Sequence, residues 1–162
     1  NGVTSAIVYL GGNIVVVGEK GESLTNSNGT MFEVGIGDPS SEMGELLGTV
    51  SCKDMTVVTS GTYERYFEAD GKKYHHVLDP FTGRPSASDL ISVTVISADG
   101  TLADCLSTSI FLQGSGALEQ YFARNDCRVI AVTKDLQVYA TPGLWDDFTI
   151  NPSKTQYTFH KS

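Results

Sequence analysis

The sequence predicts an α+β domain with a mainly antiparallel sheet and two consecutive helices. Short runs of β-branched and aromatic residues, divided by turn residues, fill the first half of the chain and are typical of strands. Apolar residues at helical spacing occur in two neighbouring segments of the second half. With 162 residues, of which 40% are hydrophobic, the chain is expected to form one domain with a core of its own and not two domains.

Strands are expected in the first half wherever β-forming residues gather between turns. The ranges are 5–10, 13–18, 32–37, 46–52, 55–59, 63–69 and 73–78. Asp70-Gly71 predicts a tight hairpin between the last two ranges, whereas Gly11-Gly12 fits either a hairpin or a bulge. Residues 21–30 are rich in turn formers, which indicates a surface loop.

The second half is expected to hold a half-buried strand over residues 90–97 that turns into a helix beginning at Thr101. A second helix is predicted over residues 117–123, and a terminal hairpin joins strands at 128–133 and 137–140. We expect residues 1–150 to form the domain and residues 151–162 to be a polar tail.

Charge and cysteine content exclude two classes of protein. The formal charge of −8, from 11 basic and 19 acidic residues, argues against a nucleic-acid surface, so an anionic ligand would need a cation. Three cysteines give no metal-binding spacing and no disulfide framework, and Cys105 and Cys127 are expected to be buried. No apolar run reaches the length of a membrane span, and the opening residues resemble neither a signal peptide nor a protein start.

The segment 101–108 is the most informative part of the sequence. Asp104 and Thr108 are four residues apart, so a helix places a carboxylate and a hydroxyl on one face, where a hard cation could meet both. On a helical wheel Cys105 falls with the apolar residues, while Ser107 and Phe111 fall on the opposite side with Asp104. The structural alternative is a capping box, in which Thr101 caps the helix and Asp104 supports the cap.

A second signal lies about twenty residues upstream, at His76 and the turn Asp79-Pro80-Phe81-Thr82-Gly83. Proline fixes φ after an aspartate that can accept from the backbone of the turn, and glycine supplies the left-handed position. His76 follows a predicted strand and fits either a functional or a hydrogen-bonded structural role. His75 beside it also allows a solvated pair of histidines.

The segment Thr59-Ser60-Gly61-Thr62-Tyr63-Glu64-Arg65 fits either a turn or a loop that offers hydroxyls, amides and a guanidinium to phosphate. Taken in order, Leu10-Gly-Gly-Asn13, this segment, the His76–Gly83 turn and Thr101–Thr108 resemble the C-terminal half of the ApbE-like family, the FAD:protein FMN transferases. The resemblance covers about residues 3–150, and the histidine turn and the Ala-Asp-x-Leu-Ser-Thr helix are its most specific parts.

The resemblance implies a Mg²⁺-dependent enzyme that splits the pyrophosphate of FAD and transfers FMN to a threonine or serine hydroxyl of an acceptor flavoprotein, releasing AMP. It implies that Asp104 and Thr108 are metal ligands and that Asp104 and His76 are catalytic, with His76 at the pyrophosphate as a base or a phosphate ligand. It further implies that Gly12, Asn13, Ser60, Glu64 and Arg65 line the FAD site. Family members are usually exported and attached to the outer face of the cytoplasmic membrane.

The family protein is about twice as long as this chain, so the resemblance implies that an N-terminal half is missing and that the fragment alone is inactive. Two other functions stay open, which are hydrolysis of FAD to FMN and AMP and flavin binding without catalysis. We also expect apolar surface that the missing half, a partner chain or a second copy would cover.

Overall fold

The computed structural model describes residues 2–21, 29–41, 44–63 and 66–161. The strands are β1 (Ala6–Leu10), β2 (Asn13–Val17), β3 (Phe32–Gly37), β4 (Leu46–Cys52), β5 (Thr56–Gly61), β6 (Tyr66–Ala69), β7 (Lys72–His75), β8 (Leu90–Ser97), β9 (Arg128–Thr133), β10 (Gln137–Ala140), β11 (Phe148–Ile150) and β12 (Thr158–His160). The helices are α1 (Gly100–Gln113) and α2 (Leu118–Phe122), with 3₁₀ turns at Ser115–Ala117 and Leu144–Asp146. The predicted α+β class is confirmed.

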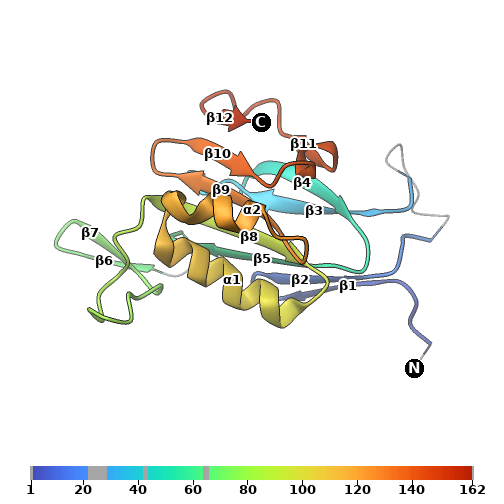
Figure 1. The fold of residues 1–162 in the computed structure, drawn as a ribbon, viewed down its shortest axis with the longest axis horizontal. Helices are drawn as coiled ribbons and strands as arrows, with labels where there is room; N and C mark the ends of the chain where they lie inside the picture. Colours follow the sequence, from blue (N-terminus) through green and yellow to red (C-terminus); the bar gives the residue numbers. More distant parts are fainter. Residues whose placement is uncertain (1, 22–28, 42–43, 64–65, 162) are drawn as a thin grey trace.

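A seven-stranded sheet in the order β1-β2-β5-β8-β9-β10-β12 forms the centre of the fold. Its neighbouring strands are antiparallel except for β10 and β12, which run parallel. Figure 1 shows α1 and α2 lying across this sheet, and α1 packs on β5 and β8. A three-stranded sheet, β11-β4-β3, lies beside it, and β6 and β7 form the hairpin predicted at Asp70-Gly71.

The large sheet has a hydrophobic core on each face, because successive side chains along its central strands point to opposite sides. Val58 and Val95 belong to the cluster that contains the α1 residues Ala103, Ile110 and Phe111. Val57 and Ile96, their chain neighbours, belong to the cluster shared with β3 and β4. The prediction of a half-buried strand at 90–97 is therefore wrong, because helices cover one face of β8 and the small sheet covers the other.

The helical wheel for α1 was also wrong in part. Ala103, Ser107, Ile110 and Phe111 are the buried residues of α1, whereas Cys105 is exposed. The buried positions recur three and four residues apart, and Cys105 lies about 200° around the helix from Ala103, on the solvent side. Cys52 and Cys127 are buried, as was predicted for Cys127.

The C-terminal segment takes part in the fold where a tail was expected. Residues 148–150 pair with β4, and residues 158–160 pair with β10. Between them, Lys154 is buried and its Nζ lies 2.8 Å from Asp38 Oδ2, while the Tyr157 hydroxyl donates to the other oxygen of Asp38. These contacts fasten residues 151–160 to the end of β3, and the boundary at residue 150 itself stays a prediction.

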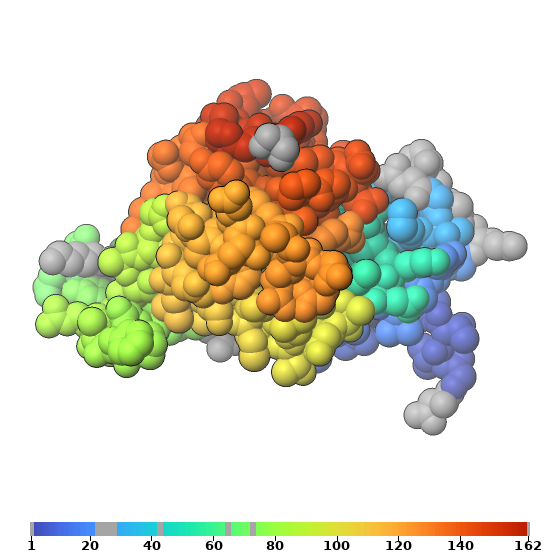
Figure 2. Space-filling model, viewed as in Figure 1, coloured from blue at the N-terminus to red at the C-terminus, as the bar shows by residue number. Residues whose placement is uncertain are grey.

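The hairpin β6–β7 and the turn after it project from one end of the molecule, where the green residues stand clear of the body in Figure 2. Of the helices in the described ranges, none is long and apolar enough to cross a membrane.

Candidate functional site

Asp104 is not part of a helix cap. Asp99 caps α1, because its Oδ1 accepts hydrogen bonds from the amides of Thr101, at 2.9 Å, and Leu102, at 3.1 Å. The capping-box alternative for Thr101 and Asp104 is thus wrong. The Asp104 carboxylate is exposed and accepts a hydrogen bond from Asn13 Nδ2 at 3.2 Å.

Thr108, one turn further along α1, meets a second residue expected in the site. The Thr108 hydroxyl lies 3.1 Å from Ser60 Oγ, and Ser60 Oγ lies 2.9 Å from Ser107 Oγ. Ser107 is fully buried and also donates to the Asp104 carbonyl at 3.0 Å. A chain of hydroxyls therefore links β5 to the exposed face of α1.

The register of β2 and β5 explains why these four side chains meet. Asn13 lies directly opposite Val58, and Val58 packs on the helix side of the sheet. Ser60 is two residues after Val58, so Asn13 and Ser60 face α1 together. Asp104 and Thr108, four apart on the helix, lie above them. The structure thus brings together Asn13, Ser60, Asp104 and Thr108. These residues come from three motifs that lie far apart in the sequence.

Gly12 precedes this cluster in the two-residue turn between β1 and β2. Leu10 pairs with Asn13, and Gly11 and Gly12 have φ of 59° and 107°. The hairpin alternative for this pair is confirmed, and the positive φ values explain why glycine is required. The Gly11-Gly12 turn therefore places Asn13 at the start of β2. Glu64 and Arg65, also expected at the FAD site, lie outside the described residues.

His76 follows the end of β7 and is exposed. The turn after it has the geometry expected, since Asp79 Oδ1 accepts from the amides of Phe81 and Thr82 and Gly83 has φ of 65°. The neighbouring residue His75 is half-buried and meets the Phe111 ring of α1 edge-on, with centroids 5.8 Å apart. The fold therefore holds this turn against α1 through His75, which excludes the solvated pair of histidines.

A groove of about 290 Å³ separates the histidine turn from the C-terminal half of α1. Asp79, Pro80 and Phe81 line one side, and Ser109 and Gln113 of the helix line the other. Ser109 follows Thr108 on α1 and lies about 100° around the helix from it. The Phe81 side chain is 96% exposed, which makes it available to a ligand or a partner at this edge.

The donor set suits a hard cation. Across the described ranges, no three His, Cys, Asp or Glu side chains come together, which argues against a self-sufficient transition-metal site. One exposed carboxylate, a hydroxyl and an amide are oxygen-bearing groups of the kind Mg²⁺ takes, and Mg²⁺ commonly fills its remaining positions with water and substrate phosphate. The residues present therefore fit a substrate-completed Mg²⁺ site.

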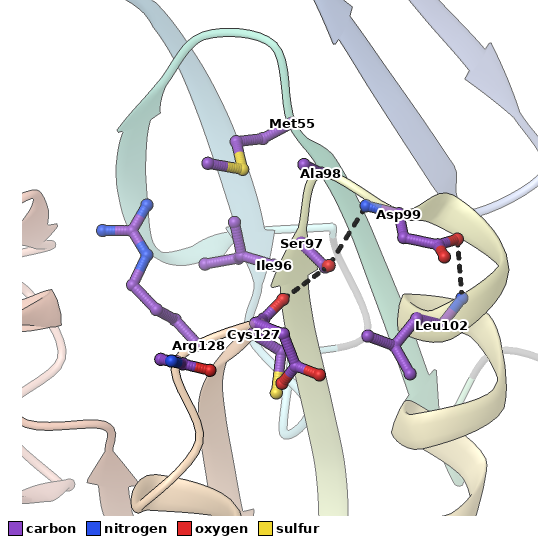
Figure 3. Close-up of a pocket in the computed structure, with 10 residues that line it drawn as sticks. Met55, Ile96, Ser97, Ala98, Asp99, Leu102, Cys127 and Arg128 are labelled. Atoms are coloured by element: carbon purple, nitrogen blue, oxygen red, sulfur yellow. Dashed lines mark hydrogen bonds between the residues drawn. The ribbon is translucent and has the colours of Figure 1, made fainter.

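A separate cavity of about 500 Å³ opens at the start of α1, between Met55, Leu102 and Arg128 (Figure 3). Its polar groups serve the fold. Asp99 caps the helix, Ser97 Oγ donates to the Asp126 carbonyl at 2.8 Å, and Arg128 Nη1 pairs with Asp147 at 2.6 Å. Because these groups already have protein partners, the cavity adds nothing to the Asp104 cluster.

Two comparisons with known proteins agree with the motifs. The chain is 39% identical over 140 residues to the FAD:protein FMN transferase of Klebsiella pneumoniae and 40% identical over 147 residues to that of Treponema pallidum. These matches cover 84% and 88% of this chain but only 40% of each relative, so the chain spans less than half the length of the curated relatives it matches.

Solved structures match over a similar extent. The ApbE protein of Thermotoga maritima superposes with a TM-score of 0.74 at 29% identity, covering 88% of this chain and 44% of that one. The flavin transferase ApbE of Vibrio cholerae gives 0.69 at 27% identity, covering 90% and 45%. A model of the ApbE family matches residues 1–132. The chain therefore belongs to the ApbE family.

Proposed function

We propose that these residues form the metal- and diphosphate-binding part of an FAD:protein FMN transferase. The observation that carries the proposal is the convergence of Asp104 and Thr108 with Asn13 and Ser60 on an exposed face of α1. The names of the relatives, which match 84% and 88% of this chain, support the same activity.

In the proposed reaction, a threonine or serine hydroxyl of an acceptor flavoprotein attacks the FMN phosphorus of FAD. A new P–O bond forms, the bond from that phosphorus to the bridging oxygen breaks, and AMP leaves with that oxygen. Asp104 and Thr108 would hold Mg²⁺, which offsets the negative charge of the diphosphate. His76 would accept the proton of the attacking hydroxyl or hold a phosphate oxygen, and Gly12, Asn13 and Ser60 would line the site next to FAD.

We further propose that the part of the family fold outside these residues covers β1. In the described part of the chain, β1 pairs only with β2, so it is an edge of the large sheet. Ile7, Val8, Tyr9 and Leu10 are 48%, 41%, 68% and 65% exposed, which leaves apolar groups on both faces of an unpaired strand. The longer relatives have the additional chain that such an edge requires. We therefore expect the 162 residues alone to be inactive.

The test uses a chimera in which this chain replaces the matching segment of the Treponema pallidum transferase. FAD, Mg²⁺ and an acceptor flavoprotein are incubated with it, and flavin that survives denaturation of the acceptor is measured together with AMP. We expect Asp104→Asn to abolish both products. Glu119→Gln, which removes a carboxylate from the exposed side of α2, is the matched control and should leave both unchanged.

The same assay separates the alternatives. FMN and AMP formed without acceptor labelling would indicate a hydrolase, and retained flavin without AMP would indicate a binding module. Full activity of Asp104→Asn would remove this carboxylate from the site. An extracytoplasmic location at the membrane follows from the family resemblance alone, and fractionation of cells that express the protein tests it.

A further inference from the structure

A cavity of about 530 Å³ lies beyond the Asp104 cluster, at the end of the large sheet. Residues from five parts of the chain line it, among them Thr62 after β5, His75 of β7, Arg84 and Ser86 after the turn, and Lys134 after β9. We call it the Arg84–Lys134 cavity. His75, which lines it, meets the Phe111 ring edge-on, and Phe111 follows Thr108 by three residues on α1.

The charge of this cavity is unlike that of the rest of the chain. The protein carries 11 basic against 19 acidic residues, and four of the described basic side chains form ion pairs with a carboxylate. The ion pairs are Lys53 with Glu19, Arg124 with Asp126, Arg128 with Asp147, and Lys154 with Asp38 and Glu45. Arg84 and Lys134 form no salt bridge with any residue that the structure describes, and both line the same cavity.

The carboxylate that interacts with Lys134 is occupied elsewhere. Asp89 is close enough for the charge of Lys134 to help lower its pKa, against the raising effect of its own burial. Its Oδ1 accepts from the Ser115 amide at 2.9 Å, and its Oδ2 accepts from the Ser115 hydroxyl. No Asp or Glu is among the described residues that line the cavity. Two cationic groups therefore line a cavity to which the described residues contribute no carboxylate.

The remaining polar groups of the lining are suited to an oxyanion. Thr62 and Ser86 supply hydroxyls. A guanidinium binds phosphate through two parallel N–H groups, and an ammonium adds a point charge. A phosphate monoester presents three terminal oxygens, one more than a carboxylate, to both cations and a hydroxyl together.

We propose that the Arg84–Lys134 cavity is a metal-independent binding site for a phosphate monoester. The phosphate could be that of a nucleotide or free inorganic phosphate, and the two share the chemistry that the lining recognises. If the proposed transferase function holds, the AMP that leaves the diphosphate is a monoester of this kind. The proposed phosphate site does not depend on that function, because it is inferred only from the residues that line the cavity.

Isothermal titration of this chain in EDTA tests the proposal with inorganic phosphate, AMP and adenosine as probes. We expect phosphate and AMP to bind and adenosine, which has no phosphate, not to bind. The double variant Arg84→Gln, Lys134→Gln should weaken binding by at least about tenfold, since each lost contact is a charge-assisted hydrogen bond. Tighter binding of AMP than of phosphate would identify a nucleotide as the source.

Arg124→Gln is the matched control, because it removes one positive charge from an exposed ion pair outside the cavity, and it should change affinity less than twofold. Asp104→Asn should leave binding in EDTA unchanged, which distinguishes this site from the proposed metal site. Urea unfolding midpoints confirm that the variants fold, and the two single variants replace the double one if it does not. No binding at millimolar phosphate, equal binding of adenosine, or equal weakening by Arg124→Gln would overturn the proposal.

Discussion

Ser107 offers a direct test of how the site is held together. Its hydroxyl is fully buried, lies 2.9 Å from Ser60 Oγ and donates to the Asp104 carbonyl at 3.0 Å. In Ser107→Ala, Ser60 keeps its bond to Thr108 at 3.1 Å, so no buried polar group is left without a partner. The variant loses two hydrogen bonds, which together contribute about 2 kcal/mol of unfolding free energy, and no stranded group adds to that loss.

Ser109→Ala is the control, because it makes the same chemical change two residues away on the same helix. The hydroxyl of Ser109 has no hydrogen bond to the described residues, and alanine favours a helix over serine by about 0.5 kcal/mol at both positions. The difference between the two variants, measured by urea unfolding, therefore isolates the Ser107 contact. Combining Ser107→Ala with Ser60→Ala in a double-mutant cycle should give a coupling of about 1 kcal/mol.

The functional consequence can be measured on the same variants. If the hydroxyl chain fixes the rotamer of Thr108, Ser107→Ala should weaken Mg²⁺-dependent binding of FAD to the chimera about tenfold, as loss of support to a metal ligand commonly does. The supporting role of Ser107 would be refuted if the two variants had the same unfolding free energy, within about 0.3 kcal/mol, and the same FAD affinity.

Two further predictions concern the C-terminal segment and the sheet edge. Burial alone raises the pKa of Asp38, but hydrogen bonds from Lys154 and Tyr157 outweigh it and hold that pKa below its usual value. The ionised Asp38 therefore stabilises the fold above its unfolded pKa of about 4, and this contribution is lost as the pH falls further. In Asp38→Asn the urea unfolding midpoint should change less with pH in that range. Burial and Asp38 raise the pKa of Tyr157 to about 12, so its contribution is present below about pH 10 and lost as the pH rises towards 12. Tyr9→Lys on β1 should reduce self-association of the chain in light scattering, whereas Phe67→Lys on β6 should not. A wild-type chain that is monomeric and binds no apolar dye would contradict the exposed edge.

Local patterns predicted most strands but not their order. The strands at 90–97, 128–133 and 137–140 have the predicted bounds, because their β-branched runs are bounded by clear turn residues. The pairing of β2 with β5 could not be derived from the sequence, because β3 and β4 lie between them along the chain and belong to a second sheet. β11 and β12 have three residues each, too few for a period, and contacts made by Lys154 and Tyr157 hold the segment between them in place.

For the site, residue spacing along α1 predicted which side chains share a face, but the sequence did not predict which side chains are buried. The interval between Asp104 and Thr108 predicted that both lie on one exposed face, which the structure confirms. Ser107 was missed because a serine is counted as polar, although it follows the buried Ala103 by four residues and precedes Ile110 by three. His75 was missed for a related reason, since its partner Phe111 is distant in sequence. Long-range contacts decide both cases.

The chain offers two different solutions to binding an anion on an acidic protein, and they respond differently to solution conditions. Asp104 and Thr108 carry negative or neutral oxygens, so a phosphate can approach them only through a divalent cation, and chelation removes that attraction. Arg84 and Lys134 attract phosphate directly and are exposed, so salt screens them, with a Debye length of about 10 Å at 0.1 M. Nucleotide binding that survives EDTA therefore belongs to the Arg84–Lys134 cavity, and binding that EDTA abolishes belongs to the Asp104 cluster. A nucleotide whose affinity falls both on chelation and in the Arg84→Gln, Lys134→Gln variant would show that the two regions act on one ligand.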